Sequence, residues 1–323
     1  MKTLKRLLCA LGVSAVCSSA SMAADAYPSQ PITLVNPYAA GGPADVLGRA
    51  LARELEKQLG KTIIVENKAG GGAAIGANFV ARAKPDGYTL LLGTSAAHVV
   101  TPLMQRTAYD GIKDFAFVTI VANQPNMLVV RSSLPVSTLP ELIALVRKEP
   151  GKINYASAGP GSSPHLGGEL FRQQAKVDIM HIPYSGAAPA INDLVGGQVD
   201  MAVLNLAASV QFIRSGKLKA LAYANPKRSA LFPDVPTLAE AGVSGAESAS
   251  WYSLAAPKGT PPDVLEKLNK AVQAVNQSAE YRKLMDAQGV ELWTMTPQEA
   301  TQFVEKDQVA MRKLVESAGL LKK

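Results

Sequence analysis

Short apolar runs alternate along the chain with longer segments whose apolar residues recur every three or four positions. The first pattern predicts buried strands, and the second predicts amphipathic helices. In the first third of the chain the predicted strands are 32–38, 62–66 and 88–93. Helices are predicted at 43–59, where evenly spaced leucines share one face, and at 75–83. This alternation is typical of an α/β fold.

The pattern restarts after a long extended segment, 117–131, which we expect to be broken at Asn123–Pro125. Beyond it the predicted strands are 154–157, 199–204, 220–223 and 253–256. The predicted helices are 138–148, 164–174, 189–195 and 210–215. The first of these helices begins with Thr138 and Glu141, the pattern of a capping box.

The C-terminal region is predicted to be helical, with no strand of its own. One helix is capped at Thr260, and the final helix opens with a capping box at Thr296–Glu299. Such helices must cover a sheet, so the simplest arrangement has the chain cross into a second domain near Asn126 and return near Trp251. We therefore expect one lobe from 24–125 with 251–323, and a second lobe from 126–250.

The N-terminus has the pattern of a signal peptide. Lys2, Lys5 and Arg6 precede a short apolar stretch, and Ser21–Ala23 offers a cleavage site, so we expect residues 1–23 to be removed. Loss of these three basic residues lowers the net charge from +7 to +4, and both cysteines leave as well. The mature chain then has no disulfide and no cysteine nucleophile, and we expect it in a bacterial periplasm.

Composition excludes several other classes of protein. The remaining charge is spread along the chain, so no nucleic-acid partner is expected. No run of about 18 apolar residues is present, so no transmembrane helix is predicted. The histidines at 98, 165 and 181 follow no metal-ligand spacing, so we expect neither a metal nor a cofactor.

Four loops that follow predicted strands are rich in Gly, Ala, Ser and Pro. They are 38–45, 93–98, 157–165 and 184–189, and none of them carries Lys or Arg. In open α/β sheets, ligands bind at the carboxyl ends of strands, where helix N-termini present free N–H groups. An anion held here would be bound by backbone amides, hydroxyls and helix dipoles, and a carboxylate suits such a cradle.

At this point the chain resembles a known family, the Bug-type receptors that serve as substrate-binding proteins of tripartite tricarboxylate transporters. The residues that carry the resemblance are Tyr27–Val35, Gly41–Asp45, Val65–Lys68, Pro85–Thr94, Leu134–Val136, Gly161–Leu166, His181–Tyr184, Gly196–Asp200, Asp234–Thr237 and Trp251. The resemblance implies an α/β fold of the type II periplasmic binding protein, in which two lobes joined by two crossover strands close on a ligand like a Venus flytrap. It also implies a monomeric receptor that delivers its ligand to a membrane permease.

The resemblance, together with the four loops, gives a set of candidate ligand-binding residues. They are Tyr38, Ala39, Ala40, Gly41, Gly42, Asp45, Thr94, Ser95, His98, Ser162, Ser163, His165, Tyr184, Ser185, Ala187 and Asn205. The sequence departs from the family pattern at Ala40, where proline is usual, at Pro164, and at Leu204, where an acidic residue is common. We expect Leu204 to make the cleft less acidic and to favour a plain acid over an amino acid.

The expected function is therefore capture of a small organic carboxylate, either a di- or tricarboxylate or an aromatic acid such as terephthalate. A competing interpretation is an exported serine hydrolase. Gly93–Ala97 approaches the nucleophile elbow of such enzymes, with Ser95 as nucleophile, a histidine as base and Asp200 to orient it. The last glycine of the elbow is absent, so we expect no enzymatic activity.

Overall fold

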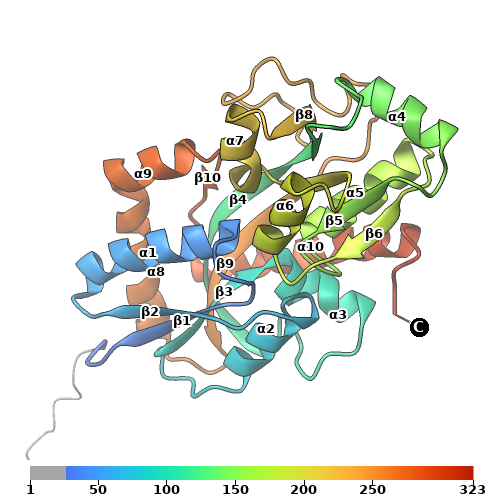
Figure 1. Cartoon of the computed structure of the whole chain (residues 1–323). Helices are drawn as coiled ribbons and strands as arrows, with labels where there is room; N and C mark the ends of the chain where they lie inside the picture. Colours follow the sequence, from blue (N-terminus) through green and yellow to red (C-terminus); the bar gives the residue numbers. More distant parts are fainter. Residues whose placement is uncertain (1–26, 323) are drawn as a thin grey trace, which may run out of the picture.

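The computed structural model describes residues 27–322, and the predicted signal peptide, residues 1–23, lies outside this range. One mixed sheet runs through both halves of the molecule in the order β2-β1-β3-β9-β4-β7-β5-β6, and β8 and β10 also pair with β4 (Figure 1). The strands are β1 (Ile32–Asn36), β2 (Ile63–Asn67), β3 (Thr89–Thr94), β4 (Phe115–Arg131), β5 (Asn154–Ser157), β6 (Met180–Pro183), β7 (Met201–Asn205), β8 (Leu218–Tyr223), β9 (Ala249–Pro257) and β10 (Glu291–Leu292).

Helices cover both faces of each half of the sheet. They are α1 (Pro43–Leu59), α2 (Ala74–Ala81), α3 (Thr101–Met104), α4 (Leu139–Lys148), α5 (Ser163–Gln174), α6 (Ala187–Val195), α7 (Leu206–Arg214), α8 (Pro262–Gln277), α9 (Ala279–Asp286) and α10 (Pro297–Ser317). Among residues 27–322, no helix combines the length and the apolar character needed to cross a bilayer.

The strand sequences explain why a hydrophobic core lies on each face of the sheet, because alternate side chains of a strand point to opposite faces. In β1, Leu34 packs with α1 and α8, whereas Val35 packs on the other face with α2 and α10. In the C-terminal half of β4, Leu128 and Met127 likewise enter different clusters. These cores on both faces of the sheet identify the α/β fold predicted from the sequence.

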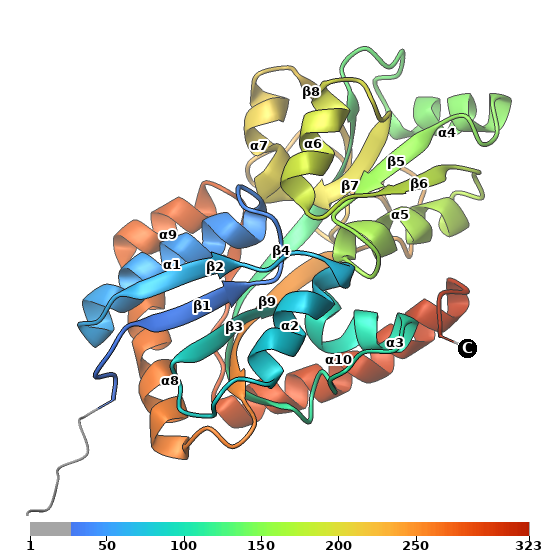
Figure 2. The same ribbon diagram turned by 60° about the horizontal axis from the view of Figure 1, so that its bottom comes forward.

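Strands β4 and β9 pass between the two halves, which lie one above the other in Figure 2. The first part of β4 pairs with β9, and the part from Asn126 onward pairs with β7 and β8. The predicted break at Asn123–Pro125 is wrong, since β4 is continuous. Pro125 lies where β4 exchanges one set of partners for another, a place where a missing N–H is tolerated.

Two details of the C-terminal region also differ from the prediction. The short strand β10 pairs with β4, so this region is not wholly helical. The hydroxyl of Thr260 donates to the carbonyl of Pro257 instead of capping α8. The capping box at Thr296 and Glu299 is confirmed. At Thr138 it is half formed, because the Glu141 carboxylate accepts from Ser137 N–H rather than from the cap residue.

Candidate functional site

The loops that follow β1, β3, β5 and β6, together with the end of β7, meet around one pocket between the two halves. Its lining residues come from both halves of the molecule and are Tyr38, Gly42, Pro43, Ala44, Thr94, Ser95, Ala158, Ser162, Ser163, Pro164, Ala187, Asn205, Ser250 and Tyr252. The predicted residues among them are Tyr38, Gly42, Thr94, Ser95, Ser162, Ser163, Ala187 and Asn205. None of the lining residues carries a formal charge.

Four helices, α1, α5, α6 and α7, begin at this pocket. The N-cap residues Gly42 and Gly186 have no side chain to accept from the first-turn N–H groups of α1 and α6. At α5, Ser162 does cap, since its Oγ accepts from the backbone N–H of His165 at 3.3 Å. Free N–H groups and aligned peptide dipoles make a helix start attractive to an anion, and here four helix starts act on the same space.

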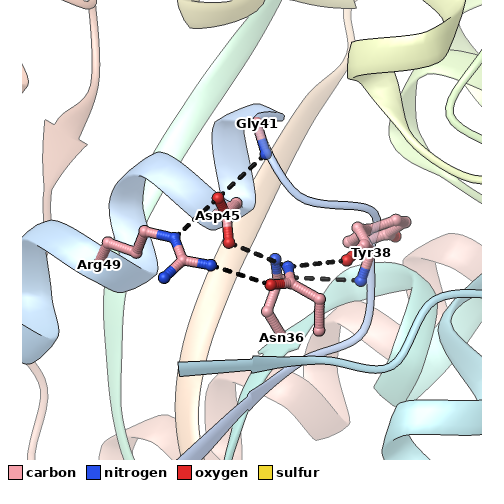
Figure 3. Close-up of polar contacts among 6 residues, drawn as sticks. Asn36, Tyr38, Gly41, Asp45 and Arg49 are labelled. Carbon is pink, nitrogen blue, oxygen red and sulfur yellow. Dashed lines mark hydrogen bonds and ion pairs between the residues drawn. The ribbon is translucent and has the colours of Figure 1, made fainter. Parts of the chain in front are cut away.

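The first ligand loop is held in shape from behind by Asp45 (Figure 3). One carboxylate oxygen accepts from Gly41 N–H and from Arg49 Nε, each at 3.0 Å, and the other accepts from Asn67 Nδ2 at 2.9 Å. The same amide of Asn67 also donates to the carbonyl of Tyr38 at 3.1 Å. Asp45 therefore positions the loop and does not line the pocket, which corrects its assignment as a ligand-binding residue.

Burial of the Asp45 carboxylate acts to raise its pKa. The hydrogen bonds from Arg49, Gly41 and Asn67 outweigh burial, and the pKa lies below its usual value. The carboxylate is therefore ionised at neutral pH, and its charge is stabilised by these donors within the protein. It offers little repulsion to an anion on the other side of the loop.

The wall of the pocket formed by β4, β7 and β9 is a network of amides and hydroxyls. Asn205 Nδ2 lies 2.8 Å from Asn126 Oδ1 and 3.1 Å from Ser250 Oγ. Tyr252 donates its hydroxyl to Gln124 Oε1 at 3.2 Å. Sequence analysis missed Ser250 and Tyr252 as lining residues. The sequence around them, Ala-Ser-Trp-Tyr-Ser-Leu at 249–254, has no regular polar alternation that would have marked them.

The two halves touch across the pocket. Ala39 N–H donates to the carbonyl of Ser185 at 3.4 Å, and Gly72 approaches the carbonyl of Pro160 too closely for any side chain. The enclosed space is about 20 Å³, which is room for one or two water molecules. A ligand of several heavy atoms therefore requires the halves to separate. Ala39 and Ser185 form the contact between the halves, while Ala40 and Gly41 are exposed on the loop outside the lining.

His98 is buried in the first half and does not reach the pocket, so its assignment to the site is wrong. Its Nδ1 lies 2.7 Å from the carbonyl of Gly111, and its Nε2 lies 3.0 Å from Ser253 Oγ. Burial lowers the pKa of His98 to about 4, so the ring is neutral. Gly93 is required here because a Cβ would collide with this histidine and with Ser253.

His165 and Tyr184 also lie behind the lining. His165 Nδ1 accepts from Gly161 N–H at 3.1 Å, and its ring stacks on His181 at 4.3 Å between centroids. Tyr184 donates its hydroxyl to Asp193 at 2.7 Å, within its own half. Both residues support ligand loops from behind. Leu204 is fully buried in an apolar cluster, so its side chain does not set the charge of the pocket as we expected.

The hydrolase arrangement fails on geometry. Ser95 lines the pocket, but His98 faces Ser253, and His165 accepts from the backbone of its own loop. The expected orienting residue, Asp200, pairs with Arg131 at 3.0 Å and accepts from Asn154 N–H. His181 Nε2 lies 2.7 Å from Ser157 Oγ, so within residues 27–322 each histidine and Asp200 is bonded elsewhere and none is positioned to activate Ser95.

A two-half α/β molecule with crossover strands and a ligand pocket between its halves is a protein of the periplasmic-binding-protein fold. The family model described as tripartite tricarboxylate transporter family receptor matches residues 47–320, and the chain belongs to this family. It is 37% identical to the protein BugT of Bordetella pertussis over 303 residues, which is 93% of each chain.

Two solved structures from Rhodopseudomonas palustris are close neighbours. One, solved with adipate, is 36% identical, with a TM-score of 0.88 over 91% of this chain and 98% of the other. The second, MatC with bound malate, is 34% identical, with a TM-score of 0.86 over 90% of this chain and all of the other. The predicted family and fold are thus confirmed.

Proposed function

We propose that this protein is a periplasmic receptor that captures a small organic carboxylate between its two halves and delivers it to a membrane permease. The single observation that carries the proposal is the meeting of four helix starts around a pocket with no charged side chain in its lining. Relatives solved with adipate and with malate support the same ligand class.

The carboxylate is bound by main-chain donors and hydroxyls. The starts of α1 and α6 meet at the contact between Gly42 and Ala187, where a Cβ built on the glycine lies 3.9 Å from the alanine Cβ. Thr94 and Tyr38 place hydroxyls on the same wall, 3.4 Å apart. Burial raises the pKa of Tyr38 to about 12, so its hydroxyl keeps the proton that it donates.

The two halves act as lobes that open and close about β4 and β9. We place the lobe boundaries where the sequence suggests them, near Asn126 and Trp251. A ligand closes the lobes only by binding the closed state better than the open state. The N-H groups of α1 and of α6 belong to different lobes, so only the closed form presents both to one carboxylate. We further propose that the protein acts as a monomer, is exported by the signal peptide at residues 1–23, and catalyses no reaction.

A thermal-shift screen tests the ligand class. Adipate, malate, citrate and terephthalate are compared with their uncharged amides at equal concentration. A carboxylate at one hundred times its dissociation constant adds about 2.7 kcal/mol of stability, and its amide adds much less. Equal shifts from acid and amide, or no shift with any acid, would contradict the proposal.

A further inference from the structure

A second cavity, of about 260 Å³, lies on the opposite face of β9 from the pocket. Ser250 and Tyr252 line the pocket, whereas Ala249 and Trp251 line this second cavity, as the alternation of a strand requires. Helices α5 and α10 approach each other on this side of the molecule (Figure 2). The side chain of Gln173 links them by donating to the carbonyl of Ser317 at 3.1 Å.

Three aromatic rings form part of its wall. Phe303 packs nearly at right angles to Trp251, with centroids 5.6 Å apart and ring planes at 81°. It packs in the same way against Trp293, at 5.7 Å and 88°. All three rings line the cavity, and the face of an aromatic ring attracts cations because its electrostatic potential is negative.

The charged residues of the wall are carboxylates. Asp307 comes from α10 and Glu247 from the segment before β9, and no lysine or arginine is among the lining residues. Asp307 accepts from the indole N–H of Trp251 at 3.0 Å, which fixes the carboxylate beside the ring. Within the described part of the chain, the ion pairs use neither of these two carboxylates. Burial raises the pKa of Asp307, and a bound cation would offset that effect.

We infer that this cavity is a second binding site, which takes a small organic ammonium ion. The alkyl groups of the ion pack against Phe303, Trp251 and Trp293, and its charge is neutralised by Asp307 and Glu247. A bare metal ion suits the wall poorly, since it needs several oxygen ligands where this wall offers ring faces. The charged and aromatic residues of this cavity are absent from the lining of the carboxylate pocket, although Ser95 and Ser163 line both.

Tryptophan fluorescence is a direct probe of this site. The chain has two tryptophans, and both line the cavity. We expect titration of the protein with tetramethylammonium chloride to give a saturable change in emission. Neutral tert-butanol, of similar shape, and sodium chloride at the same ionic strength should give none. An unsaturable response, or an equal response to tert-butanol, would overturn the inference.

Three variants test whether the change in fluorescence arises from binding in this cavity. Asp307→Asn keeps an oxygen for the indole N–H of Trp251 but removes the charge, and it should weaken tetramethylammonium binding by about tenfold or more. Phe303→Leu keeps an apolar side chain but removes a ring, and it should weaken binding by about fivefold. The matched control is Glu305→Gln, which removes a charge from an exposed position of the same helix and should leave the affinity unchanged.

Equal affinities for Asp307→Asn and Glu305→Gln would overturn the assignment of the charge. Should Asp307→Asn fail to fold, as judged by circular dichroism, Phe303→Leu and Glu247→Gln decide the question by the same titration. Thermal shifts with carboxylates are recorded separately. A failure of the carboxylate proposal therefore leaves the fluorescence result fully interpretable.

Discussion

The two faces of β9 present opposite chemistry within a few residues of each other. Ser250 and Tyr252 face a pocket of hydroxyls, one amide and helix starts, where no lining residue is charged. Trp251 faces a cavity whose charged residues are both carboxylates and whose wall includes three aromatic rings. The alternation of a strand keeps these environments apart, although Ser95 and Ser163 line both.

The comparison shows two ways in which a binding site can favour a ligand of one charge. On the pocket side, the positive potential comes from peptide groups at helix starts, so the sequence signal is Gly, Ser and Pro rather than Lys or Arg. On the other side, the negative potential comes from side chains and ring faces. The following predictions are ordered from the largest expected effect to the smallest.

Substitution of Gly42 by a large residue should abolish carboxylate binding and leave the second cavity unaffected. The backbone φ of −83° accepts any residue, and a Cβ would lie 3.7 Å from Ala188 N and Ala39 O, so the fold tolerates a side chain. A larger side chain fills the space between α1 and α6. We expect Gly42→Leu to weaken carboxylate binding by about 100-fold or more, equivalent to about 2.7 kcal/mol, in calorimetric titration. Gly42→Ala is the matched control and should bind nearly normally. Normal binding by Gly42→Leu would refute the role of the helix starts.

Asp45→Asn should loosen the first ligand loop without altering the lining of the pocket. Hydrogen bonds to charged groups contribute about 1.5–3 kcal/mol, so we expect a loss of unfolding free energy of that order and about tenfold weaker carboxylate binding. Asp110→Asn is the control, since Asp110 also accepts backbone N–H groups but is exposed and is not among the residues that line the pocket. Similar losses of affinity in both variants would show that Asp45 has no special role.

Acidification should lower both the stability of the protein and its affinity for the carboxylate, because His165 and His181 support the loops of the pocket. The pKa of His181 is lowered to about 4 and that of His165 is also lowered, in each case chiefly by burial. The unfolded chain therefore binds more protons between about pH 6.5 and the lowered values, and stability falls as the pH drops through this range. Above about pH 6.5 these groups have no effect on stability.

Denaturant melts at several pH values measure this dependence, and His181→Gln should reduce it without removing it, because His98 and His165 also have lowered pKa values. Carboxylate affinity should fall over the same range, by a few fold, because protonation of His165 Nδ1 breaks its bond from Gly161 N–H. Stability that rises on acidification from pH 6.5 would contradict this assignment.

A change in salt concentration should have the smallest effect on ligand affinity, and this effect should differ between the two cavities. Carboxylate affinity should change by no more than about twofold between low and high salt, since dipoles in a closed pocket are screened little. Tetramethylammonium affinity should fall further, because the carboxylates that attract it are partly exposed. A stronger salt effect on the carboxylate than on the ammonium ion would reverse the comparison.

Local patterns gave much of the fold. The evenly spaced leucines of α1 are buried at positions 47, 51 and 55, and the capping box begins α10 where expected. The strand β4 could not be read in this way. Pro125 disrupts a strand when judged locally, but in the molecule it lies where β4 changes partners.

The candidate site likewise has features that local sequence predicts and features that depend on tertiary packing. Sequence by itself determined that four loops without Lys or Arg follow strands and precede helices, because turn chemistry and helix starts depend on neighbouring residues. Only the tertiary structure decided that His98 turns into the core while Ser250 and Tyr252 face the pocket. It alone brings Trp251, Trp293 and Phe303 together. These outcomes depend on packing between residues far apart in the chain, and no local pattern records which face of a strand a distant helix will cover.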